Sequence, residues 1–215
     1  MLLDLEKLRE DYAAHELDIA NTNPNPLKQL EHWLEDAVNA GMPEPNAMTL
    51  ATCKPDGRPA ARVVLLKGLD DAGLDFYTNY ESRKGREMAN NSHVAAVFLW
   101  LGLHRQVRVE GRVEILPEAQ STRYFQSRPL GNQIGAAASM QSRPLPNRSL
   151  LETEFRLLEE KYAEGGPLPR PAYWGGYKIV PDRFEFWQGR RSRLHDRLEY
   201  VLEANGHWSI TRLAP

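Results

Sequence analysis

The feature that most limits what this chain can fold into is a series of β-rich runs in its middle. Five segments rich in β-branched and aromatic residues follow one another, each bounded by turn-forming residues. The tetrapeptides KPDG and DDAG, which separate the first three runs, are typical of turns. The pattern predicts strands over AMTLATC (47–53), ARVVLLKG (61–68), LDFYTN (74–79), VAAVFLW (94–100) and RQVRVEGRVEIL (105–116).

Helical patterns are inserted around these strands and do not alternate with them. Leu27, Leu30 and Leu34 recur at helical spacing before a stop at Gly41. NTNPNP (21–26) indicates a linker, because each proline disfavours a helical residue before it. We expect helices over 3–12, 27–41, 81–91, 117–127, 129–139 and 147–164, and three further strands over 177–188, 193–203 and 207–214.

Many short strands with inserted helices predict a mainly β protein, an antiparallel barrel with peripheral helices. We divide the chain into an N-terminal helix and linker (1–25) and one barrel domain (26–215), which includes the helices inserted over 117–164. Strict βαβ alternation and a G-x-G-x-x-G turn are missing, so a dinucleotide-binding Rossmann unit is not expected. The P-loop, the paired-histidine metal motifs and the Gly-x-Ser-x-Gly elbow are missing from the sequence as well.

The charge balance and the cysteine count argue against several functional classes. The 215 residues include 27 Lys plus Arg and 29 Asp plus Glu, and the resulting net charge of −2 argues against a general nucleic-acid binder. Cys53 is the only cysteine, so we expect no internal disulfide and no thiolate metal cage, and a reducing cytoplasm fits. No segment approaches the roughly 20 apolar residues of a membrane helix, and the N-terminus lacks a signal-peptide core.

The most unusual segment is FEFWQGRRSRLHDR (184–197), where basic residues recur at alternate positions. If it is a strand, Arg191, Arg193, His195 and Arg197 share one face, while Leu194 and Leu198 point to the other side, toward a core. Like charges side by side repel, so this arrangement favours a bound anion. The alternative is a solvated edge strand whose charges prevent aggregation, although arginines suit planar anion recognition better than that role requires.

The segment SRKGRE (82–87) also places cations where an anion would be favourable. Ser82 is a natural N-cap, so Arg83 and Lys84 fall in the first helical turn, where the helix dipole disfavours positive charge. A phosphate against that turn would meet free backbone N–H groups and both cations. The alternative is a surface turn with solvated charges.

Three further segments offer polar groups with a functional and a plain interpretation. Tyr124 and Arg128 share a helical face and can grip a phosphate, or form a surface cation–aromatic pair. Arg62 and Lys67 begin and end an apolar run, and can meet an anion at a barrel rim or simply be the charged ends of a buried strand. MQSRP (140–144) offers neutral donors, or ordinary turn residues.

Taken together, these segments resemble one family, the pyridoxine/pyridoxamine 5′-phosphate oxidases, over nearly the whole chain from about residue 8 onward. FEFWQGRRSRLHDR is similar to the signature of that family: an aromatic strand, Trp-Gln, a four-residue spacer and R-L-H-D-R. Other segments match in the same order: RVVLLK, FYTNYESRKGREMANN, RQVRVEG, YFQSRP, QIGAAAS, YWGGY and the terminal RLAP. A combination of this length is far more specific than any single motif.

The resemblance implies a split β-barrel homodimer with FMN in clefts between the subunits, and it implies no metal. It implies vitamin B6 biosynthesis and salvage: oxidation of pyridoxamine 5′-phosphate and pyridoxine 5′-phosphate to pyridoxal 5′-phosphate, with O2 reduced to H2O2 and ammonia released from the amine. The redox step is a hydride transfer from substrate C4′ to flavin N5. Carried over by position, the FMN-binding residues are Arg62, Val63, Val64, Leu65, Leu66, Lys67, Tyr77, Thr78, Arg83, Lys84, Gln106, Gln141, Ser142, Trp187 and Arg197.

The same resemblance assigns the substrate site. Arg193 and His195 would lie against the pyridine ring as catalytic residues, and Arg9 and Tyr12 would close over the substrate as a lid. FMN and substrate each carry a phosphate, which accounts for several basic clusters in a chain without a basic excess. The substrate-binding residues are Arg9, Tyr12, Lys67, Tyr124, Arg128, Asn132, Arg193, Leu194 and His195.

Two residues depart from the family pattern: Asn132 stands where serine is common, and Glu10 where a second arginine often occurs.

Other functions stay open at this stage. A split-barrel flavin reductase or deazaflavin-dependent oxidoreductase could bind its cofactor similarly, but would not need Tyr124, Arg128 and the Arg-Leu-His segment together. A non-catalytic carrier of FMN or pyridoxal phosphate would bind cofactor without releasing peroxide, and a nucleic-acid binder is the least favoured alternative.

Overall fold

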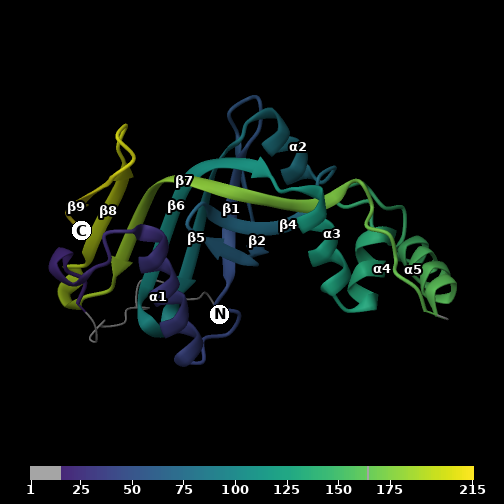
Figure 1. The fold of residues 1–215 in the computed structure, drawn as a ribbon, viewed down its shortest axis with the longest axis horizontal. Helices are drawn as coiled ribbons and strands as arrows, with labels where there is room; N and C mark the ends of the chain where they lie inside the picture. The colour runs from purple at the N-terminus through teal and green to yellow at the C-terminus, as the bar shows by residue number, and fades with distance from the viewer. Residues whose placement is uncertain (1–15, 164) are drawn as a thin grey trace, which may run out of the picture.

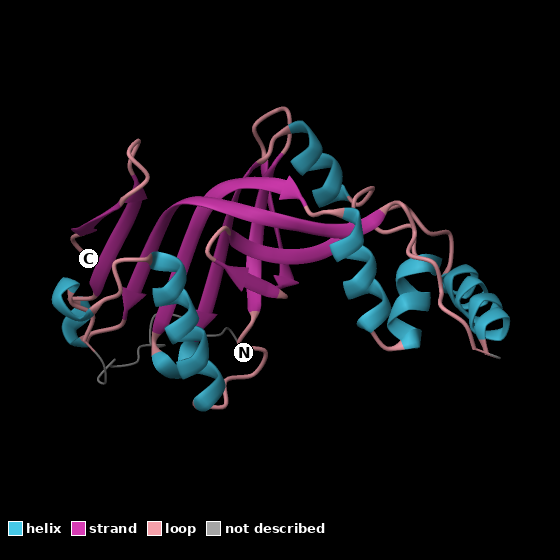
Figure 2. Ribbon diagram, in the orientation of Figure 1, coloured by secondary structure: helices cyan, strands magenta, loops and turns pink. Residues whose placement is uncertain are grey.

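The body of the molecule is one curved antiparallel sheet. The computed structural model describes residues 16–163 and 165–215, so the helix predicted over 3–12, with Arg9 and Tyr12, lies outside the described residues. Figures 1 and 2 show α1 lying against the half of the sheet that carries β8 and β9, while α3, α4 and α5 form a helical arm beyond the opposite end. The predicted arrangement, an antiparallel β-structure with peripheral helices, is confirmed.

The strands follow the order β2-β1-β5-β6-β7-β4-β3, and β8 pairs with β7 while β9 pairs with β8. Every pairing is antiparallel. The strands are β1 (Ala47–Cys53), β2 (Pro59–Leu65), β3 (Gly68–Asp70), β4 (Gly73–Asn79), β5 (His93–Trp100), β6 (Arg105–Ile115), β7 (Trp174–Gln188), β8 (Asp196–Leu202) and β9 (Trp208–Arg212).

Strand β7 connects the two halves of the sheet. Its 15 residues pair with β6 along one side, and along the other side first with β4 and then with β8. The β6–β7 register shifts between Glu110 and Gly111, next to Pro181, which cannot donate a backbone hydrogen bond. A Cβ on Gly111 would lie 2.2 Å from the Val180 carbonyl oxygen, so glycine is required at this irregularity.

The helices begin and end close to the predicted positions. Helix α1 begins at Pro26, where the side chain of Asn25 accepts a hydrogen bond from the backbone N–H of Leu27, and the chain leaves it through Gly41 at a φ of 67°. Of the predicted N-terminal helix and linker (1–25), the structure describes residues 16–25, which include a 3₁₀ turn over Ile19–Asn21. The helical elements are η2 (Ile19–Asn21), α1 (Pro26–Asn39), α2 (Arg83–Asn90), η3 (Leu101–Leu103), α3 (Glu118–Ser127), α4 (Leu130–Ala138), α5 (Arg148–Tyr162) and η4 (Arg191–Arg193).

Two hydrophobic cores hold these elements in place. The larger one lies between the sheet and α1, where the Trp33 ring packs edge-on against Phe186 at 5.1 Å. The smaller one contains Phe125 from α3, Ile134 from α4 and Trp174 at the start of β7. The helical arm is therefore anchored to the same strand that runs through the main core.

The strand predicted to begin at residue 193 begins at Asp196, so the alternation predicted for residues 191–195 is wrong. Gln188 pairs with Asp196, so residues 189–195 must reverse the chain between β7 and β8. They include the turn η4, in which Ser192 and Arg193 have φ angles of 56° and 60°. Alternate side chains of such a turn do not share one strand face, and Leu194, which was expected to point toward the core, is 71% exposed. Leu198, within β8, is buried as expected.

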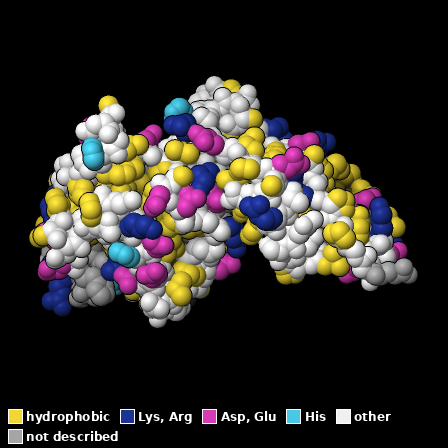
Figure 3. All heavy atoms as spheres, viewed as in Figure 1, with side chains coloured by type: hydrophobic (Ala, Val, Ile, Leu, Met, Phe, Trp, Pro, Cys, Tyr) yellow, Lys and Arg dark blue, Asp and Glu magenta, His cyan; other side chains and the backbone are white. Residues whose placement is uncertain are grey.

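The surface carries no large region of one charge in the view of Figure 3, where basic and acidic side chains are interspersed with hydrophobic ones. Within the described residues, no helix is both long and apolar enough to cross a membrane. The same residues contain no group of three or more His, Cys, Asp or Glu side chains that could hold a metal ion.

Candidate active site

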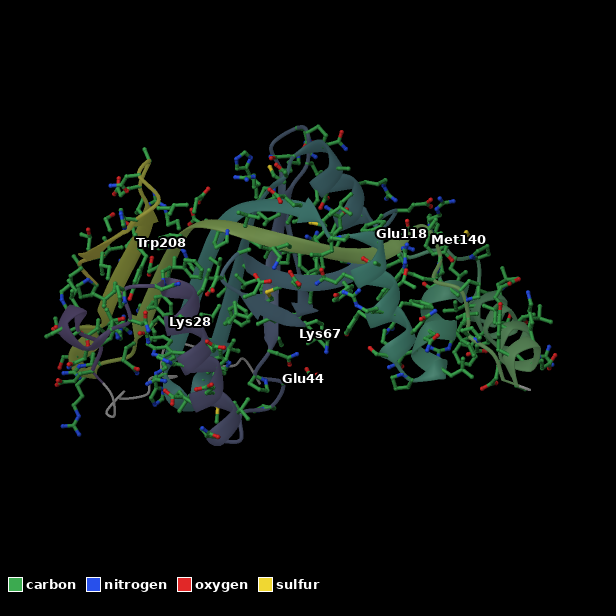
Figure 4. All side chains as sticks on the ribbon, viewed as in Figure 1. Lys28, Glu44, Lys67, Glu118, Met140 and Trp208 are labelled. Atoms are coloured by element: carbon green, nitrogen blue, oxygen red, sulfur yellow. The ribbon has the colours of Figure 1, made fainter. Side chains whose placement is uncertain are left out.

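A cavity of about 600 Å³ opens between the sheet and the helical arm. Residues at the end of β2 and on β4 contribute one side, α3 and α4 contribute the other, and α2 adds Lys84. Figure 4 shows Lys67 between the sheet and α3. The predicted site residues that line the cavity are Val63, Val64, Leu65, Lys67, Tyr77, Thr78, Lys84, Tyr124, Arg128, Asn132 and Gln141.

Two predicted arginines, one from β2 and one from α2, are held by a buried carboxylate. Arg62 Nη2 donates to Glu87 Oε2 at 3.2 Å, and Arg83 Nε donates to Glu87 Oε1 at 2.9 Å. The Thr52 hydroxyl donates to Glu87 Oε2 and accepts from Arg62 Nη1, both at 2.5 Å. Burial alone would raise the pKa of Glu87, but the hydrogen bonds from Thr52 and Arg83 and the charge of Arg62 lower it overall. We call these four residues the Glu87 cluster.

Lys84 lies between the Glu87 cluster and the cavity. Its Nζ donates to Gln141 Oε1 at 2.9 Å, and the Thr78 hydroxyl donates to the same oxygen at 3.2 Å. Burial, together with the positive charge of Arg62, lowers the pKa of Lys84 to about 8. A phosphate bound beside Lys84 would raise this pKa again, because a nearby negative charge favours the charged form of a lysine.

A stack of aromatic rings forms the opposite part of the cavity wall. The rings of Tyr77 and Tyr124 are 3.8 Å apart and nearly parallel, and Trp174 stacks 5.7 Å from Tyr77. The Arg128 guanidinium lies over the Trp174 ring at 4.8 Å. Its Nη1 is buried and has no hydrogen-bond partner among the described residues, and burial lowers the pKa of Arg128. Arg128 therefore packs on an aromatic ring, as in the plain interpretation of this residue. It also has a buried donor without an acceptor, and an anion in the cavity could accept a hydrogen bond from it.

Sequence reasoning missed two residues that shape this site. Glu87 was not singled out, although its spacing of four residues from Arg83 is typical of an ion pair on one helical face. Trp174 belongs to the YWGGY motif, but its position beneath Arg128 depends on the packing of the helical arm onto β7. The first was visible in the sequence and the second was not.

Five of the remaining predicted site residues lie at the far end of β7, where they form a second cluster: Gln106, Trp187, Arg193, His195 and Arg197. Trp187 on β7 pairs with Gln106 on β6 and with Arg197 on β8. The His195 ring lies 4.6 Å from the Trp187 ring. His195 Nδ1 accepts from the backbone N–H of Arg190 at 3.1 Å, which leaves the proton of the neutral ring on Nε2. Burial and the nearby charge of Arg193 lower the pKa of His195.

The two clusters do not meet within one chain. Trp174 lines the cavity and Trp187 belongs to the second cluster, and thirteen strand positions separate them, about 40 Å along β7. Leu66 is buried in the main core, and Leu194 is exposed outside the cavity. Ser142 lines a separate apolar cavity beside α5.

Comparison with known proteins places the chain among oxidases of vitamin B6 phosphates. Residues 34–162 match the family described as Pyridoxamine 5′-phosphate oxidase, and residues 174–215 match the Pyridoxine 5′-phosphate oxidase C-terminal dimerisation region. Pyridoxine/pyridoxamine 5′-phosphate oxidase 1 of Ralstonia nicotianae is 52% identical over 214 residues, which cover 100% of both chains. Pyridoxine/pyridoxamine 5′-phosphate oxidase of Burkholderia mallei is 54% identical, with 98% of this chain and 99% of the relative covered.

Solved structures show the same architecture. PhzG from Burkholderia lata, in complex with tetrahydrophenazine-1-carboxylic acid, has a TM-score of 0.89 at 32% identity, covering 96% of this chain and 100% of that chain. A pyridoxamine 5′-phosphate oxidase-related, FMN-binding protein from Nostoc punctiforme has a TM-score of 0.68 at 18% identity, covering 87% and 96%. The second likeness supports the fold alone.

The curved antiparallel sheet has the fold of a split barrel, and a basic cavity opens between it and the helical arm. The chain belongs to the pyridoxine/pyridoxamine 5′-phosphate oxidase family, a family of oxidoreductases, and FMN is its cofactor. The match to a dimerisation region supports a homodimer. The cavity fits FMN, because its volume suits a ligand of this size and three cationic side chains, Lys67, Lys84 and Arg128, line it. The family, the fold class and the cofactor predicted from the sequence are confirmed.

Proposed function

We propose that the protein oxidises pyridoxamine 5′-phosphate and pyridoxine 5′-phosphate to pyridoxal 5′-phosphate, with O2 as the final acceptor. For the alcohol, two electrons and two protons pass to O2 and give H2O2. For the amine, the same transfer gives H2O2, and water then releases ammonia from the oxidised carbon. Bound FMN supplies the acceptor for the substrate's electrons.

The observation that carries this proposal is a second anion-binding position in the cavity. Lys84, with the Glu87 cluster behind it, would hold the FMN phosphate. Arg128, the C-cap residue that follows α3, has a buried Nη1 without a hydrogen-bond partner among the described residues, and Tyr124, Asn132 and Lys67 line the same cavity. Two phosphorylated molecules bound together need two such positions, whereas an enzyme that binds only FMN needs one.

The remaining FMN contacts would come from both copies of the chain. The residues from Arg62 to Lys67, together with Tyr77, Thr78, Arg83, Gln141 and Ser142, would serve the flavin from one subunit. Gln106, Trp187 and Arg197 would serve it from the other, because the two clusters are about 40 Å apart along β7 within one chain. The cleft would therefore be complete only in the dimer.

Arg193 and His195 of the second copy would orient the substrate's pyridine ring. The ring of His195 is held by Trp187 and by the Arg190 backbone N–H, so its Nε2–H can donate a hydrogen bond to an oxygen of the substrate. Its lowered pKa keeps the imidazole neutral at pH 7. The role of both residues is positioning of the substrate carbon that is oxidised.

Arg9 and Tyr12 would close over this cleft from the N-terminal segment 1–25. The first described residues support this part of the proposal: the backbone N–H of Leu17 donates to Asp196 Oδ2 at 3.1 Å, and Glu16 pairs with Arg190 at 2.9 Å. The chain therefore enters the described structure beside His195.

The experiment compares substrates with and without phosphate. We expect anaerobic bleaching of the flavin by pyridoxine 5′-phosphate and pyridoxamine 5′-phosphate, weak bleaching by pyridoxine, and peroxide release once O2 is admitted. Equal rates with pyridoxine and its phosphate would contradict the proposal. Bleaching only by a reduced phenazine carboxylic acid would instead indicate a reaction on a ligand like that of the Burkholderia lata relative.

A further inference from the structure

We propose that Glu87 is a positioning residue for FMN: it holds Arg62 and Arg83 in the orientation that receives the cofactor's phosphate. The inference rests on the proposed placement of that phosphate beside α2. It goes further by assigning a role in cofactor binding to an acidic residue, which would be expected to repel a phosphate.

Glu87 is almost completely enclosed and uses both carboxylate oxygens. Only 6% of its side chain is exposed, and it does not line the cavity. Oε1 accepts from Arg83, while Oε2 accepts from Arg62 and from the Thr52 hydroxyl. The carboxylate therefore holds both guanidinium groups without itself lining the cavity.

The bonds to Glu87 leave donors of both arginines for an anion. Arg83 is bound through Nε, so its two terminal Nη groups stay available, and its side chain is 52% exposed. Arg62 is fixed by Thr52, by Glu87 and by the Leu50 carbonyl oxygen, to which Nη1 donates at 3.3 Å. A preformed fork of this kind binds phosphate without first losing side-chain freedom.

The charges also match the proposed ligand. Arg62, Arg83 and Lys84 are three cations, and Glu87 compensates one of them, so the group carries a double positive charge when Lys84 is protonated. The phosphate of FMN carries a charge close to −2 at neutral pH. Without Glu87, three cations would repel one another before the cofactor binds.

The second cluster repeats the arrangement. Glu185 is buried on β7, and both of its oxygens accept from Arg197 at 3.0 Å. Buried ion pairs are weak sources of stability, and apolar replacements are often as stable. A buried carboxylate behind the proposed FMN-binding arginines of both clusters is more simply explained by positioning than by stability.

The test is the dissociation constant of FMN, measured by quenching of flavin fluorescence in the Glu87→Gln variant. Electrostatics alone predicts tighter binding in this variant, because a negative charge near the phosphate is removed. Positioning predicts the opposite sign, and we expect binding weaker by about tenfold, since charge-assisted bonds to two arginines are lost. Unchanged or tighter binding would overturn the proposal.

A second variant leaves the charge unchanged. Thr52→Val removes the hydroxyl that links Glu87 to Arg62, and we expect FMN binding to weaken by about threefold. Glu114→Gln is the matched control, because Glu114 pairs on the surface with Arg112 and does not touch the Glu87 cluster. We expect its FMN affinity to equal that of the wild type, and equal losses in Glu114→Gln and Glu87→Gln would refute positioning.

Failure of this inference is distinguishable from failure of the proposed reaction. FMN affinity is measured without substrate, so it is informative even if vitamin B6 phosphates are not oxidised. If Glu87→Gln is too unstable to purify, Thr52→Val decides the question alone: weaker FMN binding supports the proposal, and wild-type affinity overturns it.

Discussion

Trp174 and Trp187 lie near opposite ends of the same strand, β7, and each belongs to a different group of functional residues. Trp174 supports Arg128 in the cavity, and Trp187 packs against His195. Thirteen strand positions, about 40 Å along β7, separate the two groups within one chain. The strand is anchored in both hydrophobic cores. Under the proposed function, each chain would contribute one group to one cleft and its other group to the second cleft, so that a complete site would require two chains.

Arg128→Ala tests the substrate-phosphate position. We expect kcat/KM for pyridoxine 5′-phosphate to fall about 10- to 100-fold, because a buried charge-assisted contact is lost, while FMN affinity stays at the wild-type value. Steady-state kinetics and fluorescence titration measure the two quantities. Arg123→Ala, which removes an exposed arginine from the same helix, is the control and should leave both unchanged. A parallel loss of FMN affinity in Arg128→Ala would place the cofactor phosphate there instead.

Replacing both Arg193 and His195 with alanine tests the second cluster. We expect turnover to fall at least about tenfold, equivalent to about 1.4 kcal/mol of barrier, since the substrate ring would lose its positioning contacts. Stopped-flow measurement of anaerobic flavin reduction reports this step directly. Arg191→Ala, in the same turn, is the control. Wild-type reduction rates in the double variant would exclude both residues from the reaction.

The pH dependence of FMN affinity should report Lys84. Affinity should rise between about pH 5 and 7 as the phosphate loses its second proton, whose pKa is about 6. It should fall above pH 8, because Lys84, with a pKa of about 8 in the free protein, then loses its charge. In Lys84→Arg the decline above pH 8 should disappear, since arginine stays charged. An identical decline in that variant would assign it to another group.

The same lysine has the opposite effect on the stability of the protein without FMN. Its pKa is lower in the folded chain than the ordinary value of 10.5, so the unfolded chain binds more protons between about pH 8 and 10.5. The contribution of Lys84 to the free energy of unfolding should therefore increase with pH across this window. Denaturant titrations of the wild type and of Lys84→Met, compared at pH 7.5 and pH 10, measure the difference. A contribution that decreases with pH would contradict the lowered pKa.

Strands and helices could be predicted from the sequence because local patterns determine them. The five β-rich runs between residues 47 and 116 became β1, β2, β4, β5 and β6, while the three-residue β3 was not predicted as a strand of its own. Gly41, with a positive φ, follows the first described α-helix as expected. The strand predicted to begin at residue 193 begins only at Asp196. A run of alternating basic residues does not reveal where the chain that leaves β7 starts to pair with it again as β8. Local periodicity cannot encode that long-range pairing.

The sequence predicted which residues belong to the candidate site, but not how these residues are arranged. Motif resemblance named Arg62, Arg83 and Arg128; Arg128 lines the cavity, whereas Arg62 and Arg83 do not line it and are bound to Glu87. It did not reveal that a buried carboxylate holds the first two, or that Trp174 supports the third. Those contacts join β1, β2 and α2, or α3 and β7, and depend on packing between elements distant in sequence.

Mixed dimers give the most direct test of a site divided between chains. Subunits with Arg128→Ala are defective in the cavity, and subunits with Arg193→Ala and His195→Ala are defective in the second cluster. In a mixed dimer, one cleft receives both defects and the other receives none. After denaturation and refolding of an equal mixture, half of the dimers should be mixed, so about a quarter of the wild-type activity should return.

The control refolds each variant alone, and these samples should keep their low activities. Recovery requires that both defects of a mixed dimer fall in the same cleft and leave the other cleft intact, which happens only if each cleft takes one cluster from each chain. If both clusters served the same cleft from one chain, every site in the mixture would carry a defect. Activity would then stay at the average of the two variants, and the division of the site along β7 would be disproved.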